Sequence, residues 1–386
     1  MHVRQFVAPF QLRLVSGVLL GLVAVTGASL AAPPPLGLPP VPVPAGNPIS
    51  SAKAALGGKL FTDIRFSSTG EISCSTCHAP AKAFTDSPLQ TSEGVHHLTG
   101  TRNAPTLANA AYMKRLFWDG RAKDLEDQSR LPLVNPVEMG LHDREPIIQI
   151  VRSDPDYVRM FHDVFGKEPA AVGMTEVTQA IATYERTLIF GDSPFDRWYY
   201  GGDKRAISES AQRGFKVFLE DGRCVSCHTI EQDFALFTDN RFHNIGIGIS
   251  RIEKNLPQLE SALLLAKARG VNMDKTVLSS GKTAELGRFA LSDTVDDLGA
   301  FKTPTLRNVA VTAPYMHDGS IETLRDVVEF YDHGGVIDKG DQPTDYLSGG
   351  IRPLNLTEQQ ITDLIAFLES LTSPQFAALA AHPGTP

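Results

Sequence analysis

Cys74-Ser75-Thr76-Cys77-His78 and Cys224-Val225-Ser226-Cys227-His228 are two copies of a Cys-x-x-Cys-His motif, and they use all four cysteines of the 386-residue chain. In this motif the two sulfurs form thioether bonds to the vinyl groups of a haem, and the histidine becomes an axial ligand of the iron. The sequence therefore predicts two covalently bound haem c groups, one on each motif, held by Cys74, Cys77, His78, Cys224, Cys227 and His228.

Two other uses of paired cysteines fit less well. A zinc ribbon with four cysteine ligands places its two Cys-x-x-Cys pairs roughly 15–20 residues apart. Here 146 residues lie between Cys77 and Cys224. A thioredoxin-like redox pair does not need a histidine directly after its second cysteine, and in this chain that histidine occurs twice.

Residues 1–31 are typical of a secretory signal peptide. Arg4 and Arg13 form a basic n-region, residues 14–30 are an apolar run, and Ser29-Leu30-Ala31 is a small-x-small cleavage signal. The run is on the short side for a spanning helix, so a retained membrane anchor is the alternative. Export would place the protein in the bacterial periplasm, where haem c is expected.

Residues 32–50 are rich in proline, and we expect a semi-extended tether that does not pack. The formal net charge is −8, and it becomes −10 when a leader carrying Arg4 and Arg13 is removed. This balance argues against nucleic acid and mildly favours a basic partner such as a small cytochrome c. A merely well-solvated acidic surface explains it equally well.

The chain also repeats itself beyond the cysteines. Residues 105–120 (PTLANAAYMKRLFWDG) align without gaps to residues 304–319 (PTLRNVAVTAPYMHDG) at an offset of 199, with seven of sixteen positions identical. We therefore expect a mainly α-helical, loop-rich fold of two cytochrome c-type haem domains related by internal duplication, at residues 51–203 and 204–386.

Apolar spacing predicts helices at residues 157–165, 175–190 and 207–219, and the capping box Thr357-x-x-Gln360 opens another. Similar amphipathic helices precede the two haem motifs. Each contains a glycine that allows close approach of another helix or of the haem, within Ala54-x-x-Gly57-x-x-Leu60-Phe61 and Ala211-x-x-Gly214-x-x-Val217-Phe218. Residues 251–300 have no counterpart in the first half and are expected to be a surface insertion near the second haem.

The two halves differ at positions where chemistry would be placed. Trp118 corresponds to His317, while Gln128 and Glu138 correspond to Val327 and Ile337. A glutamate over an open haem face could take a proton from bound peroxide and return it to the leaving oxygen. A glutamine nearby could orient the peroxide or a water by hydrogen bonding. Neither residue type is specific alone, since each also occurs as a helix cap or surface side chain.

Over nearly all of its sequence after the leader, the chain resembles the bacterial dihaem cytochrome c peroxidase family, which includes MauG-type oxidases. Besides the two haem motifs, the resemblance rests on Gly100-Thr-Arg-Asn-Ala-Pro-Thr106, Phe117-Trp-Asp-Gly-Arg121, Val137-Glu-Met139, Asp192-Ser-Pro-Phe-Asp-Arg197, Phe301-Lys-Thr-Pro-Thr-Leu-Arg-Asn308 and Thr312-Ala-Pro-Tyr315.

The resemblance implies a role for each half. The haem on His78 would be the peroxidatic centre, and the haem on His228 the electron-transfer centre. Trp118 matches the family tryptophan between the haems, where an aromatic ring can relay an electron. Gln128 and Glu138 match the pair beside the open haem face, with Glu138 as the acid–base residue.

Two positions bear on the subtype. In peroxidases of this family a methionine is the sixth ligand of the second haem, whereas MauG-type enzymes have a tyrosine, and Tyr331 matches that position. Met316, Met273 and His333 are the alternative ligands.

The second position is the removable histidine that blocks the first haem in classical members. His96 or His97 matches it in a loop that is one residue short, with His96 favoured, and a solvent-exposed loop histidine is the alternative.

The family also binds calcium between the haems through an asparagine side chain, backbone carbonyls and water, as suits a hard cation. Asn103, Thr312 and Pro314 match these ligands by position. Family members are often dimers, so a homodimer is a further possibility.

Three functions are therefore considered. The first is a periplasmic peroxidase that reduces hydrogen peroxide to water with electrons from a small cytochrome c or a cupredoxin. The second is a MauG-like oxidase that acts on a partner protein through a high-valent (bis-ferryl) intermediate. The third is a non-enzymatic dihaem electron carrier, which Gln128 and Glu138 disfavour because a carrier needs no acid–base pair.

Overall fold

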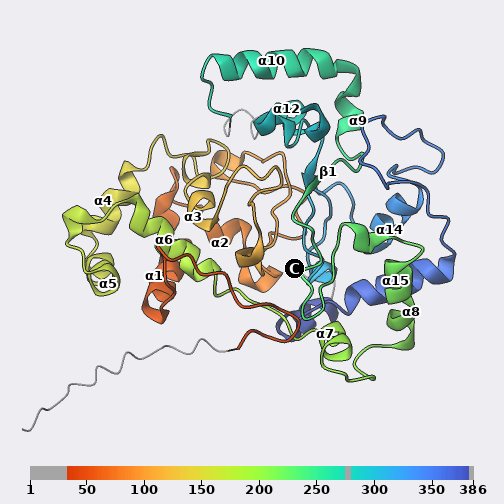
Figure 1. Cartoon of the computed structure of the whole chain (residues 1–386). Helices are drawn as coiled ribbons and strands as arrows, with labels where there is room; N and C mark the ends of the chain where they lie inside the picture. The colour runs from red at the N-terminus through yellow and green to blue at the C-terminus, as the bar shows by residue number, and fades with distance from the viewer. Residues whose placement is uncertain (1–32, 274–279, 382–386) are drawn as a thin grey trace, which may run out of the picture. The chain divides into compact units, whose positions relative to one another are not determined.

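The computed structural model describes residues 33–273 and 280–381, and these form a loop-rich, mainly helical fold (Figure 1). The predicted leader lies outside the described residues. A two-stranded antiparallel sheet pairs β1 with β2, with Phe242 opposite Lys302 and His243 opposite Phe301. Within the described ranges, no helix combines the length and apolar character that a membrane span requires.

The helices are mostly short and separated by turns. Their bounds, with those of the two strands, are α1 Ser51–Phe61, α2 Cys74–Cys77, α3 Leu125–Gln128, α4 Glu145–Ser153, α5 Pro155–Phe165, α6 Met174–Glu185, α7 Pro194–Tyr199, α8 Glu209–Leu219, β1 Phe242–His243, α9 Ile249–Ile252, α10 Leu256–Ala268, α12 Gly281–Ala284, α13 Phe289–Ser292, β2 Phe301–Lys302, α14 Leu324–Asp332, α15 Glu358–Glu369 and α16 Ala377–Ala381.

The predicted helices are present, with one end misplaced. Thr357 caps α15 as expected, accepting a hydrogen bond from the backbone nitrogen of Gln360 at 3.3 Å. The prediction of a helix to residue 190 is wrong, because α6 ends at Glu185. Phe190 lies outside the helix, and its backbone nitrogen and oxygen each lie 2.8 Å from the side-chain amide of Asn109.

A close helix pair contributes to the core of each half. In α1, a methyl group at Gly57 would overlap the carbonyl oxygen of Ala180 in α6. In α8, a methyl group at Gly214 would overlap the carbonyl oxygen of Asp363 in α15. Both glycines therefore allow another helix to approach, which is one of the two roles expected for them.

The described residues form five interior clusters of apolar side chains, of which three are the largest. The first joins α1, α5 and α6, and the second is rich in phenylalanine and joins α7, α8 and α15. The third lies within residues 249–298 and joins α9, α10 and α13. Phe376, near the C-terminus, returns to the first cluster, where its ring lies 4.7 Å from that of Phe190.

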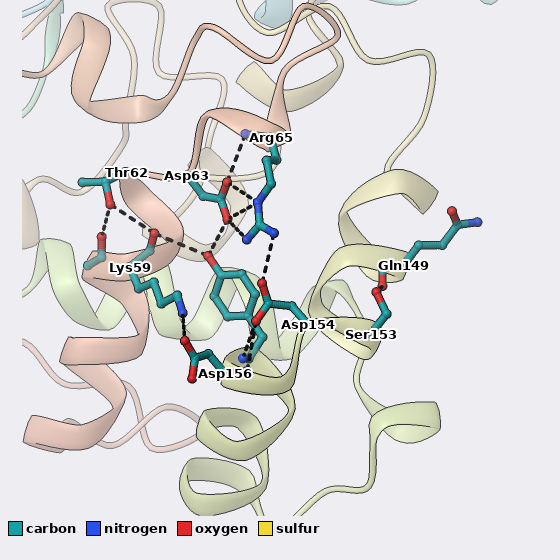
Figure 2. A network of polar contacts seen from close by, with 10 residues as sticks. Lys59, Thr62, Asp63, Arg65, Gln149, Ser153, Asp154 and Asp156 are labelled. Carbon is teal, nitrogen blue, oxygen red and sulfur yellow. Dashed lines mark hydrogen bonds and ion pairs between the residues drawn. The ribbon is translucent and has the colours of Figure 1, made fainter.

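Polar contacts fix the outer side of the first cluster (Figure 2). Asp63 accepts hydrogen bonds from the Arg65 guanidinium, the shortest at 2.6 Å, and from the Tyr157 hydroxyl at 2.8 Å. Arg65 also reaches Asp154 at 3.0 Å. This network joins the end of α1 to the start of α5.

The expectation that residues 32–50 do not pack is wrong for the part that is described. Arg307 is fully buried and forms a bidentate ion pair with Asp196, at 2.8 and 2.9 Å, while also donating to the carbonyl oxygen of Gly37. Asn47 is buried and donates to the Glu126 carboxylate at 2.8 Å. The segment turns at residues 35–38 and 44–47, and its carbonyl groups supply acceptors for the buried cations Arg307 and Lys53.

Equivalent positions in the two halves make equivalent contacts. The Thr106 hydroxyl donates to Ala83 at 2.6 Å, and the Thr305 hydroxyl donates to Leu236 at 2.7 Å. In the same way, the Asn308 side chain accepts from the backbone of Ser373 at 2.8 Å, as Asn109 does from Phe190.

Candidate functional site

Each Cys-x-x-Cys-His motif lines a large cavity. The first cavity has an empty volume of about 1500 Å³, including its open part, and is lined by Cys74, Cys77 and His78. The second has about 2060 Å³ and is lined by Cys224, Cys227 and His228. Both volumes include all space that protein atoms do not fill, open solvent included, and this space lies directly beside the cysteines and the histidine of each motif.

The cysteines lie on single helical turns and form no disulfide bonds. A spacing of three residues places both sulfurs of a turn on the same side. Burial raises the pKa of Cys74, Cys77 and Cys224 to about 12, so these thiols stay protonated at neutral pH. A dithiol redox site requires a thiolate, and this environment disfavours one.

Each motif histidine is oriented by a backbone carbonyl. The Nδ1 atom of His78 lies 3.1 Å from the oxygen of Phe84, and that of His228 lies 2.8 Å from the oxygen of Phe237. A carbonyl oxygen only accepts, so Nδ1 carries the proton and Nε2 keeps its lone pair for a metal. Burial lowers the pKa of both imidazoles, which favours this neutral form.

One wall is common to the two cavities, and Trp118 is part of it. The residues that line both cavities include Trp118, Asn103, Met113 and Lys302. The Trp118 indole donates to the carbonyl of Asn103 at 2.9 Å, and the Trp118 carbonyl accepts from the backbone of Lys302 at 2.7 Å. The backbone nitrogen of Asn103 in turn donates to the carbonyl oxygen of His317 at 2.9 Å, so residues of both halves form this wall.

Gln128 and Glu138 both line the first cavity, together with His78. Gln128 ends α3, and its Oε1 atom is buried without a hydrogen-bond partner. The segment of Glu138 is fixed by its backbone, because Glu138 donates to Asn135 at 3.2 Å and accepts from Val95 at 3.0 Å. An unpaired buried acceptor is costly, so Gln128 is a group whose partner a ligand can supply.

The loop of the two predicted histidines packs against this segment, but its imidazoles do not line the cavity. Gly94 lies against the carbonyl of Val137 too closely for a side chain. His96 and His97 are exposed, and the imidazole of His97 pairs with Glu93 at 2.5 Å. The role of His96 or His97 as an iron ligand stays a prediction.

Of the four side chains considered as the sixth ligand of the second haem, two line the second cavity. These are Tyr331 and Met316, which also pack in one apolar cluster. Met273 packs against the third cluster, and His333 contacts the carbonyl of Ile337 at 3.2 Å. Burial raises the pKa of the Tyr331 phenol.

The three predicted calcium ligands belong to the lining of the second cavity. Asn103, Thr312 and Pro314 all line it. The Asn103 amide nitrogen lies 3.2 Å from the carbonyl oxygen of Gln90 and 3.4 Å from that of Leu89, so further oxygen atoms lie beside the asparagine.

Comparison with known proteins identifies the family. Residues 51–205 match the model of the di-haem cytochrome c peroxidase family. The chain is 40% identical over 358 residues to cytochrome-c peroxidase IdrP1 of Denitromonas iodatirespirans, covering 90% of each chain. The chain belongs to the di-haem cytochrome c peroxidase family.

A MauG protein and a solved structure are also similar to this chain. Identity to the methylamine utilization protein MauG of Methylorubrum extorquens is 35% over 331 residues, covering 86% of this chain and 81% of MauG. A crystal structure of a MauG-like protein associated with microbial copper homeostasis matches with a TM-score of 0.71 and 32% identity, covering 90% and 96% of the chains. This protein is thus an oxidoreductase with two haem cofactors, of the dihaem peroxidase and oxidase type.

The structure of this di-haem peroxidase family member adds residues that sequence reasoning missed. Glu185, at the end of α6, is buried and lines the first cavity, and its Oε2 atom has no hydrogen-bond partner. Burial raises the pKa of Glu185 to about 8. One sequence signal could have identified it, since it is an acidic residue four positions after Ile181, on the apolar face of the helix.

A second missed group surrounds His317. Its ring stacks on Phe301 with centroids 3.6 Å apart, and its Nε2 atom donates to Glu285 at 2.8 Å. Arg251 pairs with both Glu285 and Asp318 at 2.6 Å. Because Arg251 bridges both carboxylates, the cluster is an ion network, and the inserted segment supplies its Arg251 and Glu285.

Replacing Glu185 by glutamine tests how the buried carboxyl group changes the pH dependence of stability. Because burial raises its pKa from 4.5 to about 8, the native state keeps a proton that the unfolded chain loses in this range. Wild-type stability therefore falls as the pH rises from 4.5 towards 8, and Glu185→Gln removes that fall. We expect the melting temperature of the haem-loaded variant to equal that of wild type near pH 4.5 and to exceed it near pH 8.

The exposed Glu145→Gln variant is the control for this comparison, because it removes a carboxylate outside the cavity. Parallel melting curves of Glu185→Gln and wild type over the whole range would contradict the assignment.

Proposed function

We propose that the protein is a periplasmic peroxidase that reduces hydrogen peroxide to two water molecules, taking two protons and two electrons. The electrons come from a small cytochrome c or a cupredoxin. The observation that carries this proposal is the placement of Gln128 and Glu138 in the cavity of His78, with the Gln128 carbonyl oxygen buried and unpaired. The family and its peroxidase members support it.

The residues present fit a covalently bound haem c in each cavity. Paired cysteines lie on one helical turn, the following histidine keeps Nε2 free, and the cavity is large. We infer that Cys74, Cys77 and His78 hold the first haem, and that Cys224, Cys227 and His228 hold the second. The first haem supplies an iron that binds peroxide, and the second supplies an electron store.

The remaining chemistry belongs to the chain. Glu138 takes a proton from the inner oxygen of the peroxide and gives it to the outer oxygen, so that the outer oxygen leaves as water. Gln128 accepts a hydrogen bond from the substrate and orients it. Trp118, fixed between the cavities, shortens the path of the electrons.

The same proposal includes the organisation of the chain. Residues 1–31 act as the signal for export, and the haem domains are residues 51–203 and 204–386, related by internal duplication. The matched contacts of Thr106 with Thr305 and of Asn109 with Asn308 support the duplication. Asn103, Thr312 and Pro314 bind one calcium ion, which their position beside one cavity supports.

A MauG-like oxidation of a partner protein is the second candidate. It is favoured by Tyr331, which lines the second cavity and, by the family resemblance, matches the tyrosine of MauG-type enzymes. A phenolate ligand stabilises ferric iron more than a methionine does. The identity of the ligand in the second cavity therefore separates the two candidates.

Glu138→Gln tests the peroxidase directly. General acid–base catalysis contributes about 10²–10⁴-fold, so kcat/KM for peroxide with a reduced small cytochrome c should fall by about 100-fold or more. The ferric absorption spectrum and the content of two haems should not change. The exposed Glu145→Gln is the matched control and should retain wild-type turnover. A modest loss in Glu138→Gln would refute its catalytic role.

Tyr331→Phe and Met316→Leu identify the ligand in the second cavity. If Tyr331 binds the iron, Tyr331→Phe changes the low-spin electron paramagnetic resonance (EPR) signal of the ferric protein and raises the potential of the second haem. Met316→Leu should then leave both unchanged. The opposite pattern would assign the ligand to Met316 and favour the peroxidase without MauG-like activity.

A further inference from the structure

Lys302 places a positive charge at the wall between the cavities. It belongs to β2, is half-buried and lines both cavities. Its Nζ atom lies 3.6 Å from the sulfur of Met113, and no carboxylate in the described part of the chain forms an ion pair with it. A thioether is a weak acceptor and carries no charge, so the ammonium group is not neutralised by the protein.

This arrangement is unfavourable without a further partner. Burial lowers the pKa of Lys302 to about 8, because the charged form is poorly solvated. A buried cation is normally paired with an anion. The backbone of Lys302 is fixed in place. Its nitrogen donates to the carbonyl of Trp118 at 2.7 Å, and the residue lies opposite Phe242 in the sheet.

The equivalent position in the first half does not carry a charge. Asn103 precedes Lys302 by the repeat offset of 199, and its amide is used by the carbonyls of Leu89 and Gln90. The charge at this position therefore occurs in the second half only, although Lys302 lines the cavities of both halves. The groups expected in these cavities are haems, and each haem carries two propionate carboxylates.

We propose that Lys302 binds a haem propionate at the wall between the cavities, and that its charge raises the reduction potentials of the haems on both sides. Reduction adds an electron, so a fixed cation nearby favours the reduced form. The pairing also keeps the amine charged at a pH at which the unpaired amine would lose its proton. This inference rests on the proposed occupancy of both cavities by haem.

Potentiometric titration of the haem-loaded protein tests it. Lys302→Met removes the charge and nearly preserves the shape, whereas Lys302→Arg keeps the charge. Lys302→Met should lower the midpoint potentials, and Lys302→Arg should stay close to wild type. Lys216→Met, at an exposed position outside both cavities, is the control and should have no effect. Unchanged potentials in Lys302→Met would overturn the proposal.

A pH series on wild type alone provides the second readout, and it does not depend on the folding of a variant. With a propionate partner, the potential of the second haem should show no step near pH 8, the pKa expected for the unpaired amine. The first haem is left out of this readout, because Glu185 lines its cavity and also has a pKa raised to about 8. A step in the potential of the second haem at that pH would overturn the proposal. Haem content separates this test from that of the function, because two haems without peroxidase activity would count against the proposed reaction and not against Lys302.

Discussion

Hydrogen bonds fix both the side chain and the backbone of Trp118, and the arrangement of the two cavities depends on these bonds. Its indole donates to Asn103, and its carbonyl accepts from Lys302, so one residue joins the loop of the first half to the sheet of the second. Because Asn103 also bonds to His317, a shift of this wall would displace groups in both cavities. In the proposed function, electrons would therefore pass a wall between the cavities that backbone hydrogen bonds fix.

The two halves share the same backbone contacts but have different residues around their cavities. Both orient the motif histidine through a carbonyl oxygen, at Phe84 and Phe237, and both use the same threonine and asparagine contacts. The differences lie at the cavity walls. The first half has Gln128, Glu138 and a buried Glu185 around its cavity, which suits proton transfer. The second has an apolar cluster with Tyr331, and His317 tied into an ion network, which suits an electron store.

The sequence predicts what depends on local spacing. The haem motifs, the capping box of Thr357 and the close approach at Gly57 follow from residues near one another in the chain, and the convergence of Trp118, Gln128 and Glu138 follows from the family resemblance. Long-range contacts escape such reasoning. The packing of the proline-rich segment depends on Arg307, 270 residues from Gly37. The end of α6 depends on Asn109, and the role proposed for Lys302 depends on its having no ion pair with any carboxylate of residues 33–273 and 280–381, which the sequence does not reveal.

The central claim is that Trp118 makes the two cavities one redox unit. Rapid-freeze EPR after one equivalent of peroxide tests it on wild type and on Trp118→Leu, each with the second haem reduced beforehand. In wild type, the ferric signal of the second haem should appear as fast as the ferric signal of the first is lost, since the electron crosses the wall. In Trp118→Leu, the signal of the first haem should be lost at the same rate, while that of the second appears more slowly. Equal rates of appearance in the variant and in wild type would contradict the account.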